Sequence, residues 1–576
     1  MKVRLAKTAG FCMGVRRAME MVLAEVNKGK GGLLTFGPLI HNNQVLGLLA
    51  SKGVKPIEDI KGLQDGTIAI RAHGVSPDKR RAIKDSGLKI IDATCPRVAR
   101  VQAIIRSYSR KGYSAIIVGD KDHPEVVGLM GYGLDHVYVI NDPDDVSRLP
   151  HLDRPFVVAQ TTQNEEKYRE VVGVLRERFP DVLVFETICE ATHDRQREVR
   201  SFADHVDAVV VVGGYHSGNT RRLAQVAREA GLPTFHVETE KDLDKKTLSG
   251  MNTVGVTAGA STPNWMIKKV VGKIEGIRGR KEAALFRWTS HTLKFLVLSN
   301  LLGAAGAFFF AHAASVLSET NPGWAFPFLA FLYVFAMHVL NRFLDKGASA
   351  YNDPERAAFL RRHKRMLVFA SITAVAGALA LSYSIGVATF LALCGLSFLG
   401  IVYSIPVVPK RIRNRFPYAK IKDIPGSRSL SEALAWTAVI GVLPLLAIDR
   451  IIWPAAILSS LVVFLMSYTR SAIFDIFQVQ GDLIVGTETL PIIIGKKRTT
   501  ALLKFIVLTT GTVLVAGAIL RVVGPFSYVI LIPLFLLCFC LLAHERRWLY
   551  PSLRFEALVE GTFFVAGFVA LIWQAL

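Results

Sequence analysis

The chain has 576 residues, of which 51% are hydrophobic, and its formal net charge at pH 7 is +22. The hydrophobic residues are unevenly spread, because residues 1–280 mix charged and apolar segments as a soluble α/β protein does, whereas long apolar stretches dominate from residue 292 onward. Many Lys and Arg residues lie in short loops between those apolar stretches, where they report the orientation of a membrane protein, so we expect no nucleic-acid partner.

Short apolar runs alternate with amphipathic, charge-rich segments in the first part of the chain. Buried strands are expected at residues 2–6, 66–72, 89–93, 114–119, 156–160, 208–214 and 252–259, and helices at residues 97–112, 165–179 and 220–231. This alternation predicts a layered α/β architecture with mostly parallel sheets.

Three cysteines, Cys12, Cys95 and Cys189, each follow an apparent strand and stand at or before a helix start. They are about one α/β subdomain apart, which predicts three similar lobes, each with one thiol at the C-terminal end of a strand, where ligands gather in open sheets. A helix N-terminus is also expected to lower the pKa of a thiol. Because three cysteines cannot all pair, a disulfide framework is a poor explanation, and a reducing cytosol fits better.

Three thiolates that meet in one place indicate a metal centre. A structural zinc site normally needs a fourth protein ligand, whereas an iron–sulfur cluster held by three cysteines leaves one iron open to substrate. Three unrelated core cysteines are the alternative that the spacing alone leaves open.

Polar residues recur at strand ends and helix starts throughout this first part, namely His41, His73, His123, Glu125, Ser217, Asn219 and Ser261. Neutral donors, histidines and backbone N–H groups at helix starts together form a cradle suited to an anion such as a diphosphate. Taken singly, each histidine is more often an ordinary surface or core residue, so the prediction depends on their recurrence at one structural position.

A series of motifs in residues 1–275 resembles the 4-hydroxy-3-methylbut-2-enyl diphosphate reductase family, the LytB or IspH enzymes of isoprenoid synthesis. In chain order the motifs are GFCMGVRRA, GPLIHN, RAHGV, DATCPRV, HPEVVGLMG, AQTTQN, TICEATHDRQ, SGNTRRL and TAGASTP. The resemblance implies a reductase domain at residues 1–280 with three α/β lobes around a [4Fe–4S] cluster.

The resemblance also implies a role for each motif residue. Cys12, Cys95 and Cys189 would hold the cluster, and the diphosphate site would comprise His41, His73, His123, Ser217, Gly218, Asn219 and Ser261, with Gly218 where relatives often carry a second serine. Thr161 would orient the substrate hydroxyl, while Glu125, beside His123, would relay protons. Electrons would come from a ferredoxin or flavodoxin-type donor. A cluster protein that only senses redox state is the alternative, and the intact Glu125 argues against it.

The second part of the chain is predicted to be an all-α polytopic membrane domain, residues 292–576, after a linker or interfacial helix at residues 281–291. Nine spans are expected near residues 292–314, 324–340, 366–383, 385–403, 433–448, 451–468, 501–520, 525–543 and 556–575. The basic loops fall on one side, which predicts an integral protein of the inner or plasma membrane with the reductase domain in the cytoplasm.

Two expected cytoplasmic loops hold acids near membrane level, Asn341 and Asp345 in NRFLD and Asp475 and Asp482 in FDIFQVQGD. Facing carboxylates can hold Mg²⁺ ions that bridge a diphosphate, although solvated helix-end charges are the simpler alternative. Together with nine spans, the pair resembles the UbiA-like intramembrane prenyltransferases, which transfer a prenyl group from its diphosphate to an acceptor. The last acid of the first motif is replaced by Ser349, and Gln478 stands where many members have Asp. An inactive membrane anchor or lipid-binding module is therefore the alternative.

Overall fold

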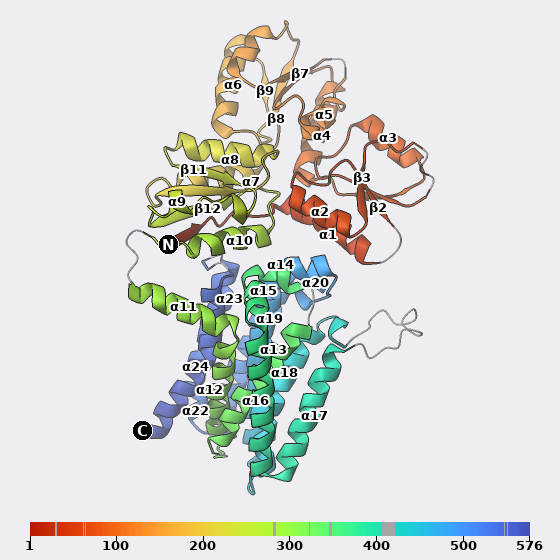
Figure 1. The fold of residues 1–576 in the computed structure, drawn as a ribbon. Helices are drawn as coiled ribbons and strands as arrows, with labels where there is room; N and C mark the ends of the chain where they lie inside the picture. The colour runs from red at the N-terminus through yellow and green to blue at the C-terminus, as the bar shows by residue number, and fades with distance from the viewer. Residues whose placement is uncertain are drawn as a thin grey trace. The chain divides into compact units, whose positions relative to one another are not determined.

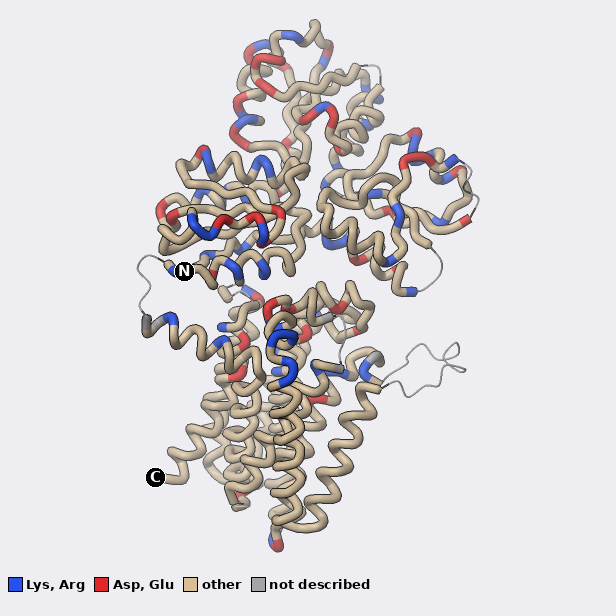
Figure 2. Tube along the Cα trace, in the orientation of Figure 1, with Lys and Arg blue, Asp and Glu red and all other residues tan. Residues whose placement is uncertain are grey.

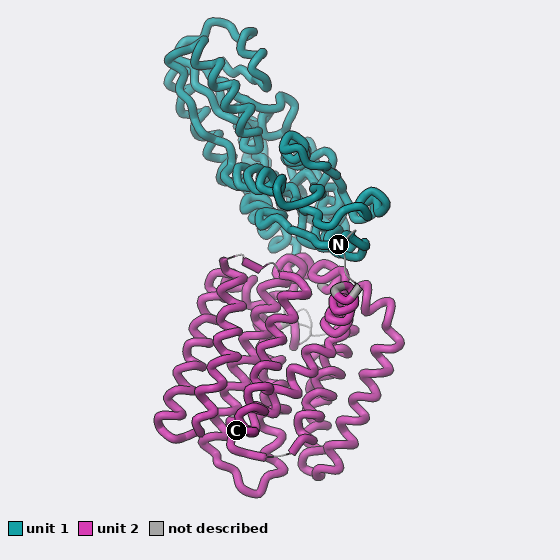
Figure 3. Tube along the Cα trace, turned by 90° about the vertical axis from the view of Figure 1, so that its left-hand side faces the viewer, with its two compact units in different colours: residues 1–282 teal, residues 283–576 magenta. Residues whose placement is uncertain are grey.

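The computed structural model describes residues 1–28, 32–61, 63, 65–134, 136–279, 284–321, 323–344, 348–405, 421–546, 548–549 and 551–576. The chain divides into two compact units, Met1–Glu282 and Ala283–Leu576 (Figure 3). The first unit combines strands and helices, and the second is helical, as the sequence predicts.

The first unit holds three four-stranded parallel sheets, one in each of three lobes (Figure 1). In spatial order the first sheet comprises β11 (Thr234–Val237), β10 (Ala208–Val212), β12 (Thr253–Ala258) and β1 (Lys2–Leu5). The second comprises β3 (Val54–Ile57), β2 (Leu33–Phe36), β4 (Thr67–Ile70) and β5 (Lys89–Asp92). The third comprises β7 (Val137–Ile140), β6 (Ser114–Val118), β8 (Pro155–Ala159) and β9 (Leu183–Val184).

The three sheets repeat one arrangement. In the second and third sheets the chain enters at an inner strand, moves to the near edge, returns to the other inner strand and ends at the far edge. The first sheet has the same order, but the N-terminal strand β1 fills its last position. The central strands β6, β8 and β10 are buried along their whole length, as expected for parallel strands covered on both faces.

Helices connect these strands and cover the sheets (Figure 1). They are α1 (Met13–Asn27), α2 (Asn43–Ser51), α3 (Pro77–Asp85), α4 (Pro96–Ser109), α5 (Pro124–Met130), α6 (Glu165–Arg178), α7 (Glu190–Arg200), α8 (Gly218–Glu229), α9 (Lys245–Leu248) and α10 (Asn264–Glu275), with 3-10 turns η1 (Pro143–Arg148) and η2 (Glu240–Asp242). All seven expected strands and all three expected helices are present. Strands β2, β3, β7, β9 and β11 are additional to those expected.

The second unit consists of helices with long apolar faces, and most of its charged residues lie toward one end (Figure 2). They are α11 (Ala284–Leu298), α12 (Leu301–Leu317), α13 (Ala325–Leu344), α14 (Ala348–Asn352), α15 (Pro354–Arg362), α16 (Lys364–Ile385), α17 (Val387–Ser404), α18 (Ser427–Thr437), α19 (Trp453–Val485), α20 (Leu490–Ile493), α21 (Lys496–Ile519), α22 (Phe526–Val529), α23 (Leu531–Glu545) and α24 (Leu553–Ala575), with short turns η3 (Ile421–Asp423), η4 (Ala438–Val442) and η5 (Leu443–Ala447). Within the described ranges, eight helical stretches are long and apolar enough to cross a membrane, or up to nine if one bent pair is a single span. Exposed apolar side chains such as Phe369, Leu508 and Phe535 suit contact with lipid.

Three expectations for this unit need correction. The span expected at 292–314 is broken by a 75° bend between α11 and α12, where Asn300 adopts a left-handed conformation with φ 67°. The span expected at 433–448 begins earlier, at Ser427, and its second half is π and 3-10 helix. The segment FDIFQVQGD is not a loop, because α19 continues through it for 33 residues in all.

Candidate functional site

Each of the three cysteines caps the N-terminus of a helix: Cys12 for α1, Cys95 for α4 and Cys189 for α7. All three have extended backbone conformations, and all three follow the equivalent edge strands β1, β5 and β9. The repeated sheet therefore presents one thiol per lobe at the same structural position.

The thiols lie together. Cys95 interacts electrostatically with both other cysteines, and a Cβ placed on Gly14 in the first turn of α1 would lie 2.4 Å from the Cys95 Sγ. The backbone N–H of Val15 lies 3.4 Å from the Cys12 Sγ, the usual way in which helix starts support sulfur ligands.

A buried cation stands beside this group of thiols. Arg195 is 4% exposed, interacts electrostatically with Cys12 and Cys189, and its Nε has no hydrogen-bond partner among the described residues. Three thiols, the N–H groups of the helix starts and a buried guanidinium fit a centre that carries negative charge, as an iron–sulfur cluster held by thiolates does.

Burial changes the expected chemistry of the free thiols. It raises the pKa of Cys95 and of Cys189, and outweighs the backbone N–H groups that lower it. The N–H groups of the helix starts thus lower the pKa as expected, but burial has the larger effect and the net shift of these two thiols is upward. A bound metal ion would deprotonate the thiols outright.

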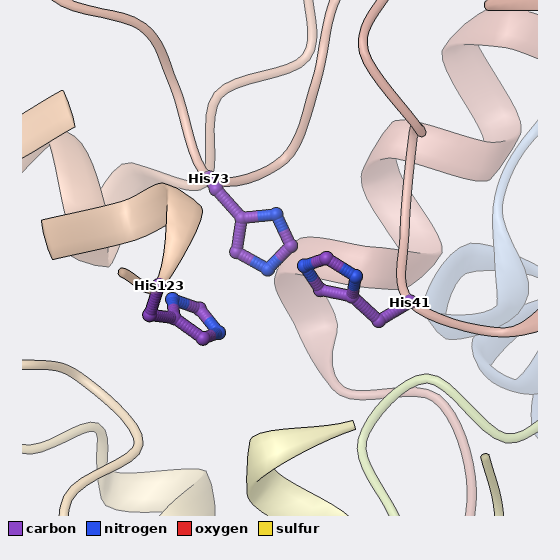
Figure 4. Close-up of side chains that lie close together, drawn as sticks. All are labelled: His41, His73 and His123. Carbon is purple, nitrogen blue, oxygen red and sulfur yellow. The ribbon is translucent and has the colours of Figure 1, made fainter. Parts of the chain in front are cut away.

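Three histidines form a second cluster. His41 follows β2, His73 follows β4, and His123 caps α5 after β6, and their rings turn toward one another (Figure 4). The ring centroids lie 4.7 Å apart for His41 and His73, 5.6 Å for His41 and His123, and 5.4 Å for His73 and His123. One ring nitrogen from each lies within 4.8 Å of the others, so the cluster can hold a metal ion or an anion.

The electrostatics favour an anion. Burial lowers the pKa of His123 to about 4 and also lowers the pKa of His41 and His73, so all three rings are neutral at pH 7. The guanidinium of Arg71 acts in the same direction on all three. A positive field repels a metal cation and attracts a diphosphate.

The histidines present unused hydrogen-bonding atoms. The Nδ1 of His123 accepts from the Glu125 backbone N–H at 3.1 Å, so its Nε2 carries the proton and can donate. His41 Nε2, His73 Nδ1 and Asn219 Nδ2 are buried and have no hydrogen-bond partner among the residues that the structure describes. Unpartnered buried polar atoms of this kind indicate a place for a ligand.

Glu125 lies at the start of α5 with a 2% exposed side chain. Its carboxylate accepts the Thr161 backbone N–H at 2.7 Å and the Thr161 hydroxyl at 2.9 Å, so it pairs with Thr161 and not with the His123 ring. Burial raises the pKa of Glu125 in spite of these hydrogen bonds. A carboxyl group that keeps its proton at higher pH is suited to proton donation.

The remaining expected residues close the cradle from the first lobe. Ser217 caps α8, and a Cβ placed on Gly218 would lie 3.9 Å from the His123 Nε2, which puts this helix start against the histidines. The Ser261 hydroxyl donates to the His41 carbonyl at 3.0 Å.

Cysteines and cradle share the same loops. The Cys12 N–H donates to the Ala260 carbonyl next to Ser261, the Cys95 N–H to the Ala72 carbonyl next to His73, and the Cys189 N–H to the Thr161 carbonyl. Cys12 and Cys95 are therefore hydrogen-bonded through their backbone to loops that carry a cradle residue, and Cys189 to the loop of Thr161, the partner of Glu125.

Sequence reasoning missed three arginines. Arg195 and Arg71 lie beside the thiols and the histidines as described, and Arg222 joins two lobes by donating to Asp120 at 3.0 Å and to the Thr162 carbonyl at 2.8 Å. Each arginine lies inside one of the motifs RAHGV, TICEATHDRQ and SGNTRRL, and that position is the signal by which the sequence could have indicated it.

The second unit buries two acids of α19. Asp475 is 2% exposed and Asp482 is 0% exposed, and the Arg428 guanidinium lies 3.7 Å from one and 3.6 Å from the other. Ser429 donates to Asp475, and Asn352 donates to Asp482 at 2.7 Å. Two carboxylates that share one cation are aimed at a common point, which fits a cation site.

The other two residues expected at this site are less informative. Asn341 lies in α13, where its amide oxygen accepts from the Ser404 hydroxyl at 3.1 Å. Asp345 lies outside the described residues.

The comparisons with known proteins divide the chain in the same way. Residues 3–275 match the family model of the LytB protein, and residues 300–568 match that of the UbiA prenyltransferase family. The 4-hydroxy-3-methylbut-2-enyl diphosphate reductase of Geotalea uraniireducens is 45% identical over 281 residues, which are 49% of this chain and 99% of that protein. The reductase of the same name from Geobacter sulfurreducens is 42% identical over 282 residues, 49% of this chain and 100% of that protein.

Two solved structures are also similar. The E-1-hydroxy-2-methyl-but-2-enyl-4-diphosphate reductase of Plasmodium falciparum is 30% identical, with 47% of this chain and 87% of that chain covered and a TM-score of 0.46. A UbiA homolog of Archaeoglobus fulgidus bound to DMAPP and Mg²⁺ is 18% identical, with 48% and 99% covered and a TM-score of 0.36.

The first unit is thus a three-lobed α/β enzyme domain with a cysteine centre and an anion cradle. The chain belongs to the LytB family of 4-hydroxy-3-methylbut-2-enyl diphosphate reductases, and its residues 300–568 match the UbiA prenyltransferase family model.

Proposed function

We propose that the first unit reduces 4-hydroxy-3-methylbut-2-enyl diphosphate to isopentenyl and dimethylallyl diphosphate, with a [4Fe–4S] cluster held by Cys12, Cys95 and Cys189. The observation that carries this proposal is the set of backbone hydrogen bonds that ties Cys12 and Cys95 to loops of the neutral cradle and Cys189 to Thr161. Two electrons and two protons are consumed, the C4–O bond breaks, the oxygen leaves as water, and one new C–H bond forms.

The protein's own groups bind the substrate and supply protons. When bound, the cluster supplies single electrons and a Lewis-acidic iron, chemistry that no side chain offers. The cradle of His41, His73, His123, Ser217, Gly218, Asn219 and Ser261 holds the diphosphate through neutral donors and the start of α8. Thr161 orients the substrate hydroxyl, and Glu125, hydrogen-bonded to Thr161, delivers a proton along that path.

Anaerobic turnover tests this proposal. The full chain, purified without oxygen and supplied with reduced viologen, should convert the substrate to both C5 diphosphates, and a ferredoxin or flavodoxin-type protein should replace the viologen. A cluster-loaded protein that forms neither product would contradict the proposal and favour a redox-sensing role.

We further propose that the second unit transfers a prenyl group from a polyprenyl diphosphate to an acceptor, with Mg²⁺ bound by Asp475, Asp482, Asn341 and Asp345. Support comes from the Arg428 guanidinium, a single cationic group that Asp475 and Asp482 share. The prenyl C–O bond breaks and diphosphate leaves, a new bond joins the prenyl carbon to the acceptor, and the acceptor gives up a proton. Bound Mg²⁺ would neutralise the charge of the diphosphate. On this proposal the chain lies in the inner or plasma membrane with the first unit in the cytoplasm, where its electron donor is found.

Membranes that contain the full chain test the transferase. Labelled polyprenyl diphosphate and Mg²⁺ should yield a labelled lipid, and chelation of Mg²⁺ should abolish it. If no label is transferred although the same membranes reduce the C5 substrate, the second unit is an anchor or lipid-binding module.

A further inference from the structure

A cavity of about 620 Å³ opens between the lobe of the first sheet and the lobe of the third. One wall is helix α8, which contributes Gly218, Arg221, Gln225 and Arg228. The opposite wall consists of the loops after β6, β7 and β8 and the start of α6. The lining is polar, so the cavity suits a charged ligand and not the hydrocarbon chain of a lipid.

The cations of this cavity are of two kinds. Arg222 forms an ion pair with Asp120 at 3.0 Å, and Lys167 forms one with Asp142 at 2.5 Å. Arg221 and Arg228 are exposed and form no ion pair within the described ranges of the chain. The two are seven residues apart on α8, which is two turns or about 10 Å along the helix.

The position of Arg221 is not explained by helix stability. It is the fourth residue of α8, near the end of the helix whose dipole disfavours cations. Arg228, in the last turn, has the favourable position, so its presence alone would carry no argument. A cation kept at the unfavourable end is consistent with use by an anionic ligand.

The cavity reaches the start of α8, next to the cradle. Gly218 lines the cavity, and its Cβ position lies 3.9 Å from the His123 Nε2. From Arg228 through Gln225 and Arg221 to Gly218, one face of α8 leads from the surface to the helix start that Ser217 caps. An anion that enters over Arg228 therefore moves toward the positive end of the helix dipole and the histidine donors.

We propose that this cavity captures the diphosphate substrate from solution and guides it along α8 into the cradle. The inference rests on the proposed reductase function. Arg221 and Arg228 act before the substrate reaches the cradle, so they set the rate of association and leave the bound complex largely unchanged.

The test compares the double variant Arg221→Gln/Arg228→Gln with wild type in the full holoenzyme, with viologen as reductant so that no protein donor takes part. At low salt, kcat/KM should fall about tenfold in the variant, and the difference should vanish near 0.5 M salt, where screening shortens the range of the field. The value of kcat should change less than twofold. Arg106→Gln/Arg110→Gln at the end of α4, two exposed arginines outside the cavity, removes the same number of charges as a control and should change neither value.

A binding measurement separates this inference from the reductase proposal. Stopped-flow association of inorganic diphosphate with the holoenzyme should be slower in the double variant, with an unchanged dissociation rate. If association and its salt dependence equal those of wild type, or if kcat falls equally at all salt concentrations, the capture role is wrong. A wild-type chain that reduces no substrate would refute the proposed function, while the diphosphate association rate would still decide the role of the cavity.

Discussion

Glu125→Gln removes the proton of the candidate acid and little else. The Glu125 Oε1 accepts the Thr161 N–H at 2.7 Å, and its Oε2 accepts the Thr161 hydroxyl at 2.9 Å. A glutamine amide oxygen can keep the hydrogen bond from the Thr161 N–H. The glutamine NH₂ can donate to the Thr161 hydroxyl oxygen, so the second hydrogen bond is kept with donor and acceptor exchanged. We expect a loss of folding stability of no more than about 1 kcal/mol.

The catalytic effect should be much larger. Loss of a positioned proton donor costs about 10²–10⁴-fold in rate, or roughly 3–5 kcal/mol of barrier. Because burial raises the pKa of Glu125, the wild-type acid stays protonated to higher pH and loses its proton as the pH rises through that value. The wild-type kcat should therefore fall on the alkaline side, and this limb should disappear in the variant.

The assay is anaerobic turnover with reduced viologen between pH 5 and 9, together with the thermal midpoint and the cluster absorbance of each protein. Glu177→Gln, an exposed acid in α6, is the matched control and should behave as wild type. A Glu125→Gln protein with full cluster content and wild-type turnover would refute the assignment of Glu125 as proton donor.

The remaining predictions concern the cluster, the cradle and the acids of the second unit. Gly14→Ala should abolish the iron–sulfur absorbance, because the new Cβ would lie 2.4 Å from the Cys95 Sγ. Gly173→Ala is the control: its new Cβ would have nothing within 4 Å, so the variant should keep the absorbance and gain about 0.4–1 kcal/mol of stability. Burial lowers the pKa of His123 to about 4, and a bound anion raises it, so binding of inorganic diphosphate should take up more protons as the pH falls from 7 to 5. Titration calorimetry in buffers of different ionisation enthalpy measures this proton uptake. Equal heats in all buffers would contradict a histidine cradle. Asp475→Asn keeps an acceptor for Ser429, so the membrane unit should fold while Mg²⁺-dependent prenyl transfer falls about 10- to 100-fold, and unchanged transfer would exclude this acid as a ligand.

The sequence predicted the α/β class of the first unit and the helical class of the second because both depend on periodicity and length. It missed β2, β3, β7, β9 and β11, which are two to four residues long. Polar residues or Pro interrupt β3 (VKPI) and β11 (TFHV), whereas β2 (LLTF) and β7 (VYVI) are apolar but too short for a clear strand period. The repeated order of the sheets was also hidden, since β1 completes a sheet whose other strands lie more than 200 residues later.

The candidate site was predictable only where residue types repeat at strand ends. Arg195 near the thiols could not be found in this way, because its role depends on a guanidinium that donates to the Gly10 carbonyl, 185 residues away. FDIFQVQGD read as a loop because its polar residues suggest solvent, yet Arg428, Ser429 and Asn352 from other segments satisfy its acids inside the unit. Long-range partners of this kind leave no local pattern in the sequence.

Mössbauer spectroscopy of the full chain loaded with ⁵⁷Fe tests the central claim most directly. A four-iron cluster held by Cys12, Cys95 and Cys189 should show three similar irons and one distinct iron, and only the distinct iron should change when 4-hydroxy-3-methylbut-2-enyl diphosphate is added. Four equivalent irons, or a spectrum that the substrate leaves unchanged, would contradict the account.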